Sequence, residues 1–466
     1  MTDHTYEAVM SRKNDIMQSS LKLDFSKYER GGVEFDYDDM MRDVGLSIEE
    51  VISIERSLGV GDTPLLELRN ITALARKLAK PGFGASILVK DEACNPSGSF
   101  KARRAALSSY DAKRKNYKGV IAATSGNYGA AVASMAARLG LKCIVIQECY
   151  DSRFVGQPEI LEKQRKCEAF GAEVIQLTVG PELFFYTLRL LEETGFYNAS
   201  LYTPSAITGI ETLGYELILQ CKERYGRAPD WVLATHAGGG NLTGTARGIM
   251  KAGCEDVNIA AVSVDLSGLS MASDGDFNRK SFTTGHTGFG IPFATLPDRS
   301  DVPRNAARAL RYMDRYLLVK QGEVFYTTEM LASLEGLERG PAGNTSLAGA
   351  FALARELPEE AMIVVQETEY TGAGKHPMPQ LTFAKRNGID VIVGDPENEV
   401  PGKSIVIPSH PSLFRVRDVN LTRLRRSALR NIAGDRRAFS NDEIAYMAAE
   451  VNLSIKETEA LLETLR

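Results

Sequence analysis

Three loops in this sequence are rich in glycine, serine or threonine, and each follows a segment that predicts a β-strand. The first covers residues 95–101 (NPSGSFK), the second residues 124–129 (TSGNYG) and the third residues 237–244 (AGGGNLTG). Because ligands in open α/β sheets bind outside the carboxyl ends of the strands, we expect the three loops to share one crevice. They would bring a lysine amine, an asparagine amide and a run of glycine N–H groups to one ligand.

The third loop places three glycines in succession, Gly238, Gly239 and Gly240. Without side chains, their N–H groups can point together at an anion, helped by the N-terminus of the following helix. The loop is neither a Walker loop, since no GxxxxGK[ST] occurs, nor a dinucleotide fingerprint, since Thr243 replaces the last glycine. If the loop binds phosphate, a side chain at Gly239 would occupy the space of the anion. A tight turn that needs positive φ is the structural alternative.

Lys101 ends the first loop and begins a predicted helix. A lone lysine is ordinarily a solvated surface charge. A lysine that forms a Schiff base must instead be desolvated or lie near another cation. Ser97, Gly98 and Ser99 leave space beside Lys101, and Arg103 and Arg104 add positive charge nearby. A lysine, a glycine phosphate cup and an asparagine-bearing loop are the parts that a pyridoxal phosphate site needs.

In this order, the three loops resemble the signatures of the fold type II pyridoxal-phosphate enzymes, the family of threonine synthase, cysteate synthase, cysteine synthase and the tryptophan synthase β chain. Residues 340–346 (GPAGNTS) and 371–375 (TGAGK) agree with the same family. The resemblance covers roughly residues 61–395. It implies an α/β fold of two lobes with pyridoxal 5′-phosphate between them.

The resemblance also implies roles for single residues. Lys101 would hold the cofactor covalently and carry the catalysis, and Asn127 would bond the 3-hydroxyl group of the cofactor. The phosphate site would consist of Gly238, Gly239, Gly240, Asn241 and Leu242. The substrate carboxylate would bind at Thr124, Ser125 and Gly126. Thr371 would face the pyridine nitrogen, with Thr368 and Glu369 as alternatives. No metal is expected, because the five histidines show no metal-ligand spacing.

Longer stretches are similar to the β subunits of 2-amino-4-oxopentanoate thiolases, at residues 90–104, 147–153 and 366–376. This resemblance implies thiolysis of that amino-ketone by coenzyme A, giving acetyl-CoA and alanine, with a small α subunit as partner. The chain departs from threonine synthases at Ala102, where they carry Asp. The loop from Thr371 to Pro377 is also one residue shorter than theirs.

Two alternatives stand beside the thiolase. One is a β-replacing or eliminating enzyme related to threonine or cysteate synthase. The other is a non-catalytic regulatory subunit that keeps the cofactor fold. An intact Lys101, Asn127 and glycine turn argue against the regulatory subunit.

The elements that must position these loops follow a regular order. Short apolar runs alternate with helical stretches, which is typical of an α/β fold with largely parallel sheets. The predicted strands are residues 85–90, 119–123, 143–147, 173–178, 231–235, 260–265, 362–366 and 391–394. We expect a helical extension at 1–60, a large lobe from 61–94 and 206–400, a small lobe at 95–205 and a helical tail at 401–466. Three capping boxes, beginning at Ser47, Ser440 and Ser454, each predict a helix start.

Composition narrows the class of protein. The 466 residues include 55 Lys and Arg against 60 Asp and Glu, a net charge of −5 that gives no general attraction to nucleic acid or anionic membranes. The uncharged stretch at 119–137 has polar residues at its middle, so it predicts no membrane span. Residues 1–15 contain no apolar core segment, so we expect no secretory signal, and six cysteines without a CxxC pair favour the cytoplasm. Cys94, near Lys101, could accept an acyl group, but a small buried hydrophobe is the favoured role.

The end of the chain is rich in arginine. Eight arginines lie between residues 415 and 437, before the last two capping boxes. A solvated helix face is the ordinary interpretation of such a cluster. A surface for a partner subunit or a second copy is the alternative, and we expect the protein to be an oligomer.

Overall fold

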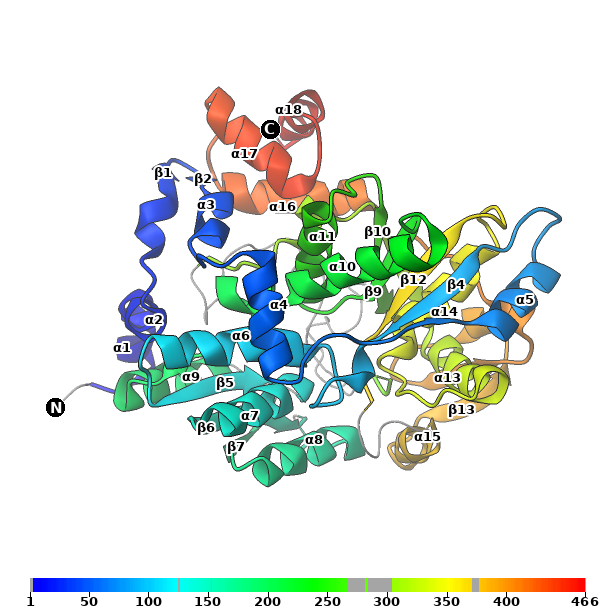
Figure 1. Cartoon of the computed structure of the whole chain (residues 1–466), viewed down its shortest axis with the longest axis horizontal. Helices are drawn as coiled ribbons and strands as arrows, with labels where there is room; N and C mark the ends of the chain where they lie inside the picture. The colour runs from blue at the N-terminus through cyan, green and yellow to red at the C-terminus, as the bar shows by residue number, and fades with distance from the viewer. Residues whose placement is uncertain are drawn as a thin grey trace.

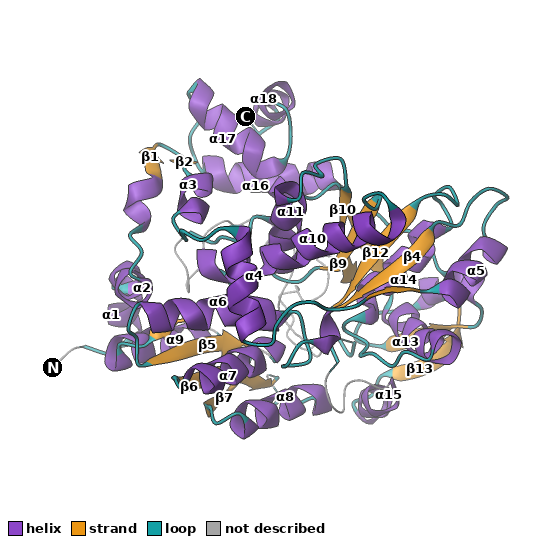
Figure 2. Ribbon diagram, viewed as in Figure 1, coloured by secondary structure: helices purple, strands orange, loops and turns teal. Residues whose placement is uncertain are grey.

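The computed structural model describes residues 3–124, 126–151, 153–180, 182–266, 281–283, 304–370 and 377–465. Its main elements are two sheets, each covered by helices on both faces (Figures 1 and 2). The smaller sheet has the strand order β7-β6-β5-β8, and all of its strands run parallel. These strands are β5 (Gly119–Thr124), β6 (Lys142–Tyr150), β7 (Glu173–Thr178) and β8 (Tyr197–Asn198).

Alternate residues of the small sheet enter different cores, as a sheet covered on both faces requires. Val120 and Val145 pack with the alanine-rich face of α7 (Asn127–Leu139), while Ile121 and Ile146 pack with Leu188. Three helices, α6 (Lys101–Arg114), α7 and α8 (Pro158–Ala169), lie on the first side. Helix α9 (Glu182–Thr194) lies on the other side, together with α1 (Tyr6–Ser11) and α2 (Lys13–Leu21).

The larger sheet has the order β11-β10-β9-β12-β4-β3. Only its edge strand β3 (Leu65–Glu67) runs antiparallel to its neighbour. The parallel strands are β4 (Ser86–Asp91), β9 (Trp231–Thr235), β10 (Asn258–Val264), β11 (Arg315–Val319) and β12 (Met362–Glu367). One face packs on α10 (Pro204–Tyr225) and α11 (Gly240–Lys251), and the other on α5 (Arg69–Leu78), α13 (Gln321–Glu335) and α14 (Asn344–Ala354).

The eight predicted strands are all present, and the expectation of an α/β fold with largely parallel sheets is confirmed. Strand β11 was not predicted from the sequence. Nor was β14 (Ser404–Pro408), which pairs parallel with β13 (Asp390–Gly394) next to α15 (Pro377–Arg386). The segment from residue 401 was expected to be a helical tail, but it begins with this strand because β13 offers it a partner. Its helices start only at Leu421.

The N-terminal residues form α1, α2, α3 (Tyr37–Arg42) and α4 (Ile48–Ser57), with a small hairpin of β1 (Glu29–Gly31) and β2 (Glu34–Phe35). The C-terminal helices α16 (Leu421–Ala433), α17 (Asn441–Val451) and α18 (Ile455–Glu463) lie beside this hairpin and α11 (top of Figure 1). All three predicted capping boxes are formed. Leu429 and Met447 of the tail are buried in the same core as α10 and α11, so the tail packs on its own chain.

None of the described helices is both long and apolar enough to cross a membrane. The six cysteines are unpaired.

Candidate active site

The three loops from the sequence meet at one cavity of about 140 Å³ between the two sheets. The walls come from both halves of the fold, because α6, α7, α8 and α9 line one side while β9, α11 and the end of β12 line the other. Among the described residues, those predicted for the site and found in its wall are Lys101, Thr124, Gly126, Asn127, Gly238, Gly239, Gly240, Asn241, Thr368 and Glu369. The shared crevice was thus correctly expected. Ser125 and Thr371 lie outside the described residues.

Lys101 is the first residue of α6, and backbone bonds fix the loop before it. The Phe100 N–H donates to the Thr368 carbonyl at 3.1 Å, and the Tyr370 N–H donates to the Gly98 carbonyl at 2.7 Å. Gly98 has φ +73°, and a Cβ there would collide with the Tyr370 carbonyl, so only glycine fits this close approach. The segment after β12 therefore holds Lys101 at the cavity.

The amine of Lys101 is enclosed by protein although its side chain reaches the cavity. Burial lowers the pKa of Lys101 to about 8, and the positive charges of Lys163 and Arg104 contribute to this decrease. The Glu369 carboxylate acts in the opposite direction. A lysine with such a pKa has an appreciable neutral fraction near physiological pH, which nucleophilic and basic lysines require.

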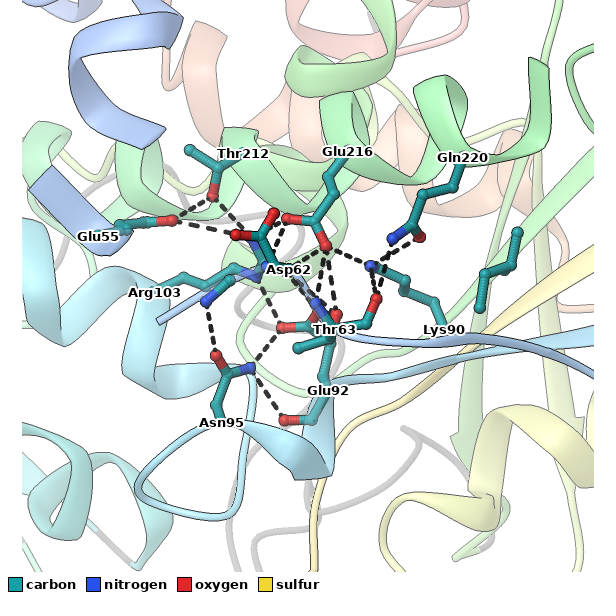
Figure 3. Close-up of polar contacts among 12 residues, drawn as sticks. Glu55, Asp62, Thr63, Lys90, Glu92, Asn95, Arg103, Thr212, Glu216 and Gln220 are labelled. Carbon is teal, nitrogen blue, oxygen red and sulfur yellow. Dashed lines mark hydrogen bonds and ion pairs between the residues drawn. The ribbon is translucent and has the colours of Figure 1, made fainter. Parts of the chain in front are cut away.

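Two residues after Lys101, the Arg103 guanidinium is completely buried in a charged network (Figure 3). Arg103 makes two 2.7 Å bonds to Glu92, in the turn after β4, and bonds of 3.2 and 3.3 Å to Glu216 on α10. Glu216 is also paired with Lys90. Burial disfavours the charge of Glu216, yet Arg103 and Lys90 lower its pKa to about 2. The network thus fastens the start of α6 to both β4 and α10.

The network also reaches the N-terminal extension and the Lys101 loop. Glu55 of α4 lies 3.7 Å from Arg103 and accepts a 2.7 Å bond from Thr212. Burial raises the pKa of Glu55 well above its usual range, while the Arg103 charge and the bond from Thr212 oppose that rise. Asn95, the first residue of the Lys101 loop, donates to Glu92 at 2.9 Å and accepts from the Gly61 N–H at 3.0 Å (Figure 3).

The second loop turns sharply around a threonine hydroxyl. Thr124 Oγ1 accepts from the Gly126 N–H at 2.9 Å and from the Gly129 N–H at 3.2 Å. A Cβ on Gly126 would lie 2.7 Å from Cδ of Lys163, so glycine at this position makes room for a buried lysine. Asn127 begins α7, and its buried amide oxygen has no hydrogen-bond partner in the structure.

The glycine turn has no room for side chains. A Cβ at Gly238 would collide with the Tyr202 hydroxyl, and one at Gly240 would lie 3.0 Å from a nitrogen of Arg104. Gly239 has φ +83°, and its Cβ would lie 3.0 Å from Ala309. A Cβ at Gly239 would thus meet Ala309 and His236 first, and its effect on an anion at this turn stays a prediction.

Two further predicted residues complete this turn. Asn241 is buried, and neither its amide oxygen nor its amide nitrogen has a hydrogen-bond partner in the structure. The side chain of Leu242 is fully buried in the core around α10 and α11 and does not line the cavity.

Sequence reasoning missed a buried acid–base cluster in the cavity wall. Lys163 of α8 lines the cavity, is paired with Glu159 one turn earlier, and lies 3.7 Å from Glu369. Burial opposes its charge, yet Glu159 and Glu369 raise the pKa of Lys163 above its usual value. Burial raises the pKa of Glu159 to about 7, and Gln380 of α15 donates to that carboxyl group at 3.0 Å. An i, i+4 Glu–Lys pair on a helix ordinarily marks a solvated face, so the sequence held no signal for this cluster.

Cys94 also departs from its expected role. It was expected to be a small buried hydrophobe, but it is exposed, because the turn after β4 directs it outward. Its thiol donates to Asp91 at 3.2 Å, and partial burial together with Asp91 raises the pKa of Cys94. A thiol that keeps its proton is a weak nucleophile.

The cavity has the features that pyridoxal phosphate requires. Its wall carries an enclosed lysine amine with a lowered pKa, a glycine turn at the N-terminus of α11, and buried amide atoms of Asn127 and Asn241 that lack partners. Buried polar atoms without partners are costly, and a polar ligand would satisfy them. The residues present therefore fit this cofactor. The described residues contain no cluster that could hold a metal ion.

Comparisons with known proteins agree with this geometry. The family model described as pyridoxal-phosphate dependent enzyme matches residues 56–369. The chain is 60% identical over 464 residues to the 2-amino-4-ketopentanoate thiolase beta subunit of Acetoanaerobium sticklandii, covering 100% of this chain and 98% of that protein. It is 62% identical over 451 residues to a protein of the same name from an unknown prokaryotic organism, covering 96% and 95% of the two chains.

Solved structures share the fold. A threonine deaminase from T.th. superposes with a TM-score of 0.53 at 27% identity, covering 70% of this chain and 98% of that one. Maize serine racemase superposes with a TM-score of 0.53 at 20% identity, covering 73% and 97%, which is a likeness of fold alone.

Proposed function

The chain belongs to the pyridoxal-phosphate dependent enzyme family, and we propose that it cleaves 2-amino-4-oxopentanoate with coenzyme A, as the β subunit of a two-subunit thiolase. The observation that carries this proposal is the identity of 60–62% along nearly the whole chain to two proteins named 2-amino-4-ketopentanoate thiolase beta subunit. That similarity extends beyond residues 56–369, which the family model covers, to both ends of the chain.

The proposed reaction is balanced without an oxidant or a metal. The sulfur of coenzyme A forms a bond to C4 of the substrate, and the bond between C3 and C4 breaks. The acetyl group leaves as acetyl-CoA, while C3 receives the proton that the thiol gave up, so the remainder is alanine. Pyridoxal phosphate, when bound, draws into its ring the electron pair that the broken bond leaves on the substrate.

The residues of the chain have separate tasks in this proposal. Lys101 holds the cofactor and, once its amine is free, moves a proton at Nζ, for which a pKa of about 8 suits it. Asn127 bonds the ring hydroxyl of the cofactor, which would satisfy its buried amide oxygen. The glycine turn and the start of α11 hold the phosphate through backbone N–H groups.

The substrate side of the cavity is the loop from Thr124 to Gly126, at the N-terminus of α7. We assign the carboxylate of the substrate to this loop, because a helix N-terminus favours an anion. Lys163 lies behind Gly126 and keeps a positive charge next to this site. Glu369 lies 3.7 Å from Lys163 and its charge also acts on Lys101, so Lys163 orients the carboxylate without making the cavity strongly cationic.

The relatives' names contain the words beta subunit, which supports a partner subunit for this chain. We propose a small α subunit as that partner and the cytoplasm as the location. Six unpaired cysteines support a reducing compartment.

The test is to coexpress the chain with the product of the neighbouring gene. Purified complex is mixed with 2-amino-4-oxopentanoate and coenzyme A, and acetyl-CoA and alanine are measured together. Equal amounts of both products are expected, with none from Lys101→Ala. If the complex instead releases phosphate from O-phosphohomoserine or replaces a β substituent of a serine derivative, the thiolase proposal is wrong and the synthase alternative is correct.

A further inference from the structure

The guanidinium of Arg104 is buried and has no carboxylate partner among the described residues. Only 3% of Arg104 is exposed. Among the described residues, its Nε has no hydrogen-bond partner and its Nη1 reaches the Leu201 carbonyl alone, at 3.4 Å. Arg103, the preceding residue, is equally buried but has Glu92 and Glu216 as partners. A buried charge without a partner is costly, so Arg104 needs an anion that the described protein does not supply.

The guanidinium of Arg104 is held in place by aromatic rings. Its central carbon lies 5.3 Å from the centre of the Phe100 ring and 5.7 Å from that of Tyr128. Contacts of this kind attract a cation to the face of a ring and limit its movement. Burial lowers the pKa of Arg104 to about 10, which leaves the group charged at physiological pH.

The position of Arg104 identifies the anion. Arg104 lines the cavity beside the glycine turn, and its Nη2 and Nη1 lie 3.0 and 3.5 Å from the place where a Cβ of Gly240 would stand. Gly240 is also the first residue of α11, so N–H groups and the positive end of a helix face the same space. A guanidinium, a glycine turn and a helix N-terminus converge on one point, which is the arrangement that binds a phosphate group.

We propose that Arg104 binds the phosphate of pyridoxal phosphate, as a charged partner added to the backbone glycine turn. The inference rests on the cofactor site in the proposed function but not on the identity of the acyl substrate. Arg104 would act as a positioning residue, since it holds the phosphate end of the cofactor while Lys101 holds the other end. Because both residues lie on the first turn of α6, movement of that helix would shift both ends of the cofactor together.

The experiment compares pyridoxal 5′-phosphate with pyridoxal, which lacks the phosphate. Wild-type holoprotein, Arg104→Gln and Arg104→Lys are freed of cofactor and titrated with each compound, following absorbance. For Arg104→Gln we expect a loss of about 10- to 100-fold in affinity for pyridoxal phosphate, the range of a hydrogen bond to a charged group. Affinity for pyridoxal should change less than about twofold. Arg104→Lys, which keeps a point charge, should lose less than Arg104→Gln.

A matched control variant and a second measurement separate a specific effect of Arg104 on the phosphate from a general loss of structure. Arg114→Gln changes an arginine on the same helix that pairs with Asp111 away from the cavity, and it should leave both affinities unchanged. The phosphorus NMR signal of the bound cofactor should move in Arg104→Gln and stay in place in Arg114→Gln. Should Arg104→Gln fail to fold, wild-type apoprotein should still unfold at a higher temperature in inorganic phosphate than in chloride of equal ionic strength.

Several results would overturn the proposal. Equal losses of affinity for the two compounds would mean that Arg104 only shapes the cavity. Unchanged affinities with an unmoved phosphorus signal, or an apoprotein indifferent to inorganic phosphate, would show that Arg104 does not meet the phosphate. A protein that passes these tests but makes no acetyl-CoA would retain this inference and refute the proposed thiolase.

Discussion

Replacing Arg103 with methionine is the sharpest test of the network below Lys101. Methionine fills most of the space but removes the charge, and Glu92 is then left completely buried without its main partner. Of the two cations in the network, only Lys90 remains, and it pairs with Glu216 rather than Glu92. Breaking a buried ion pair by removing one partner costs about 3–5 kcal/mol.

That cost converts into a shift in melting temperature. With an unfolding entropy of about 2.1 cal/mol/K per residue, the 466 residues give about 1 kcal/mol/K if both halves of the fold unfold together. Arg103→Met should therefore lower the melting temperature by about 3–5 °C. The start of α6 should loosen as well, so the fraction of cofactor fixed by borohydride on Lys101 should fall.

The assay is thermal unfolding of the holoprotein, followed by circular dichroism and by cofactor absorbance. Arg56→Met is the matched control, because Arg56 pairs with Asp62 nearby while both side chains are more than half exposed. An exposed pair contributes about 0–1 kcal/mol, so this variant should change the melting temperature by about 1 °C or less. The double variant Arg103→Met/Glu92→Gln removes the stranded charge too and should be more stable than Arg103→Met alone.

Two outcomes would refute this reasoning. If Arg103→Met is as stable as Arg56→Met, the buried ion pairs of Arg103 make no net contribution to the stability of the protein. If adding Glu92→Gln only lowers stability further, the cost in Arg103→Met comes from lost packing and not from an unpaired carboxylate.

Three further predictions concern the site and the tail. Gly239→Ala should lower cofactor affinity about tenfold, because a Cβ at positive φ costs about 1–2 kcal/mol and would press on Ala309. The control is Gly253→Ala, at φ +68° in open space beyond the same helix, which should leave that affinity unchanged. In wild-type apoprotein, the rate of cofactor attachment should reach half its maximum near pH 8. Glu369→Gln should move that midpoint to a lower pH, because the Glu369 carboxylate raises the pKa of Lys101. An unchanged or higher midpoint in this variant would contradict the prediction. Deleting residues 439–466 should lower the melting temperature measurably, because those helices bury side chains in their own chain's core; a truncated protein of unchanged stability would show that the tail serves association alone.

Much of this protein could be read from residues that are neighbours in the chain. The eight strands follow from continuous apolar runs, and the capping boxes depend on a serine and a glutamate three residues apart. The three loops were also visible, because glycine, serine and threonine are required locally where a strand turns into a helix. The loops after β4 and β9 were expected together because the carboxyl ends of parallel strands in one sheet share an edge. The loop after β5 belongs to the other sheet, and it joins them only because the two sheets face one cavity.

What the sequence could not decide was which charges meet. Arg103 and Arg104 are adjacent and chemically identical, yet one is paired with Glu92 and Glu216 while the other has no carboxylate partner among the described residues. Lys163 and Glu369 lie 3.7 Å apart although about two hundred residues separate them. Coulomb energies and pKa values depend on distance and burial in three dimensions, and neither quantity is contained in the order of residues. The chain therefore carries its cofactor chemistry in local motifs, and the folded structure sets the electrostatics around them.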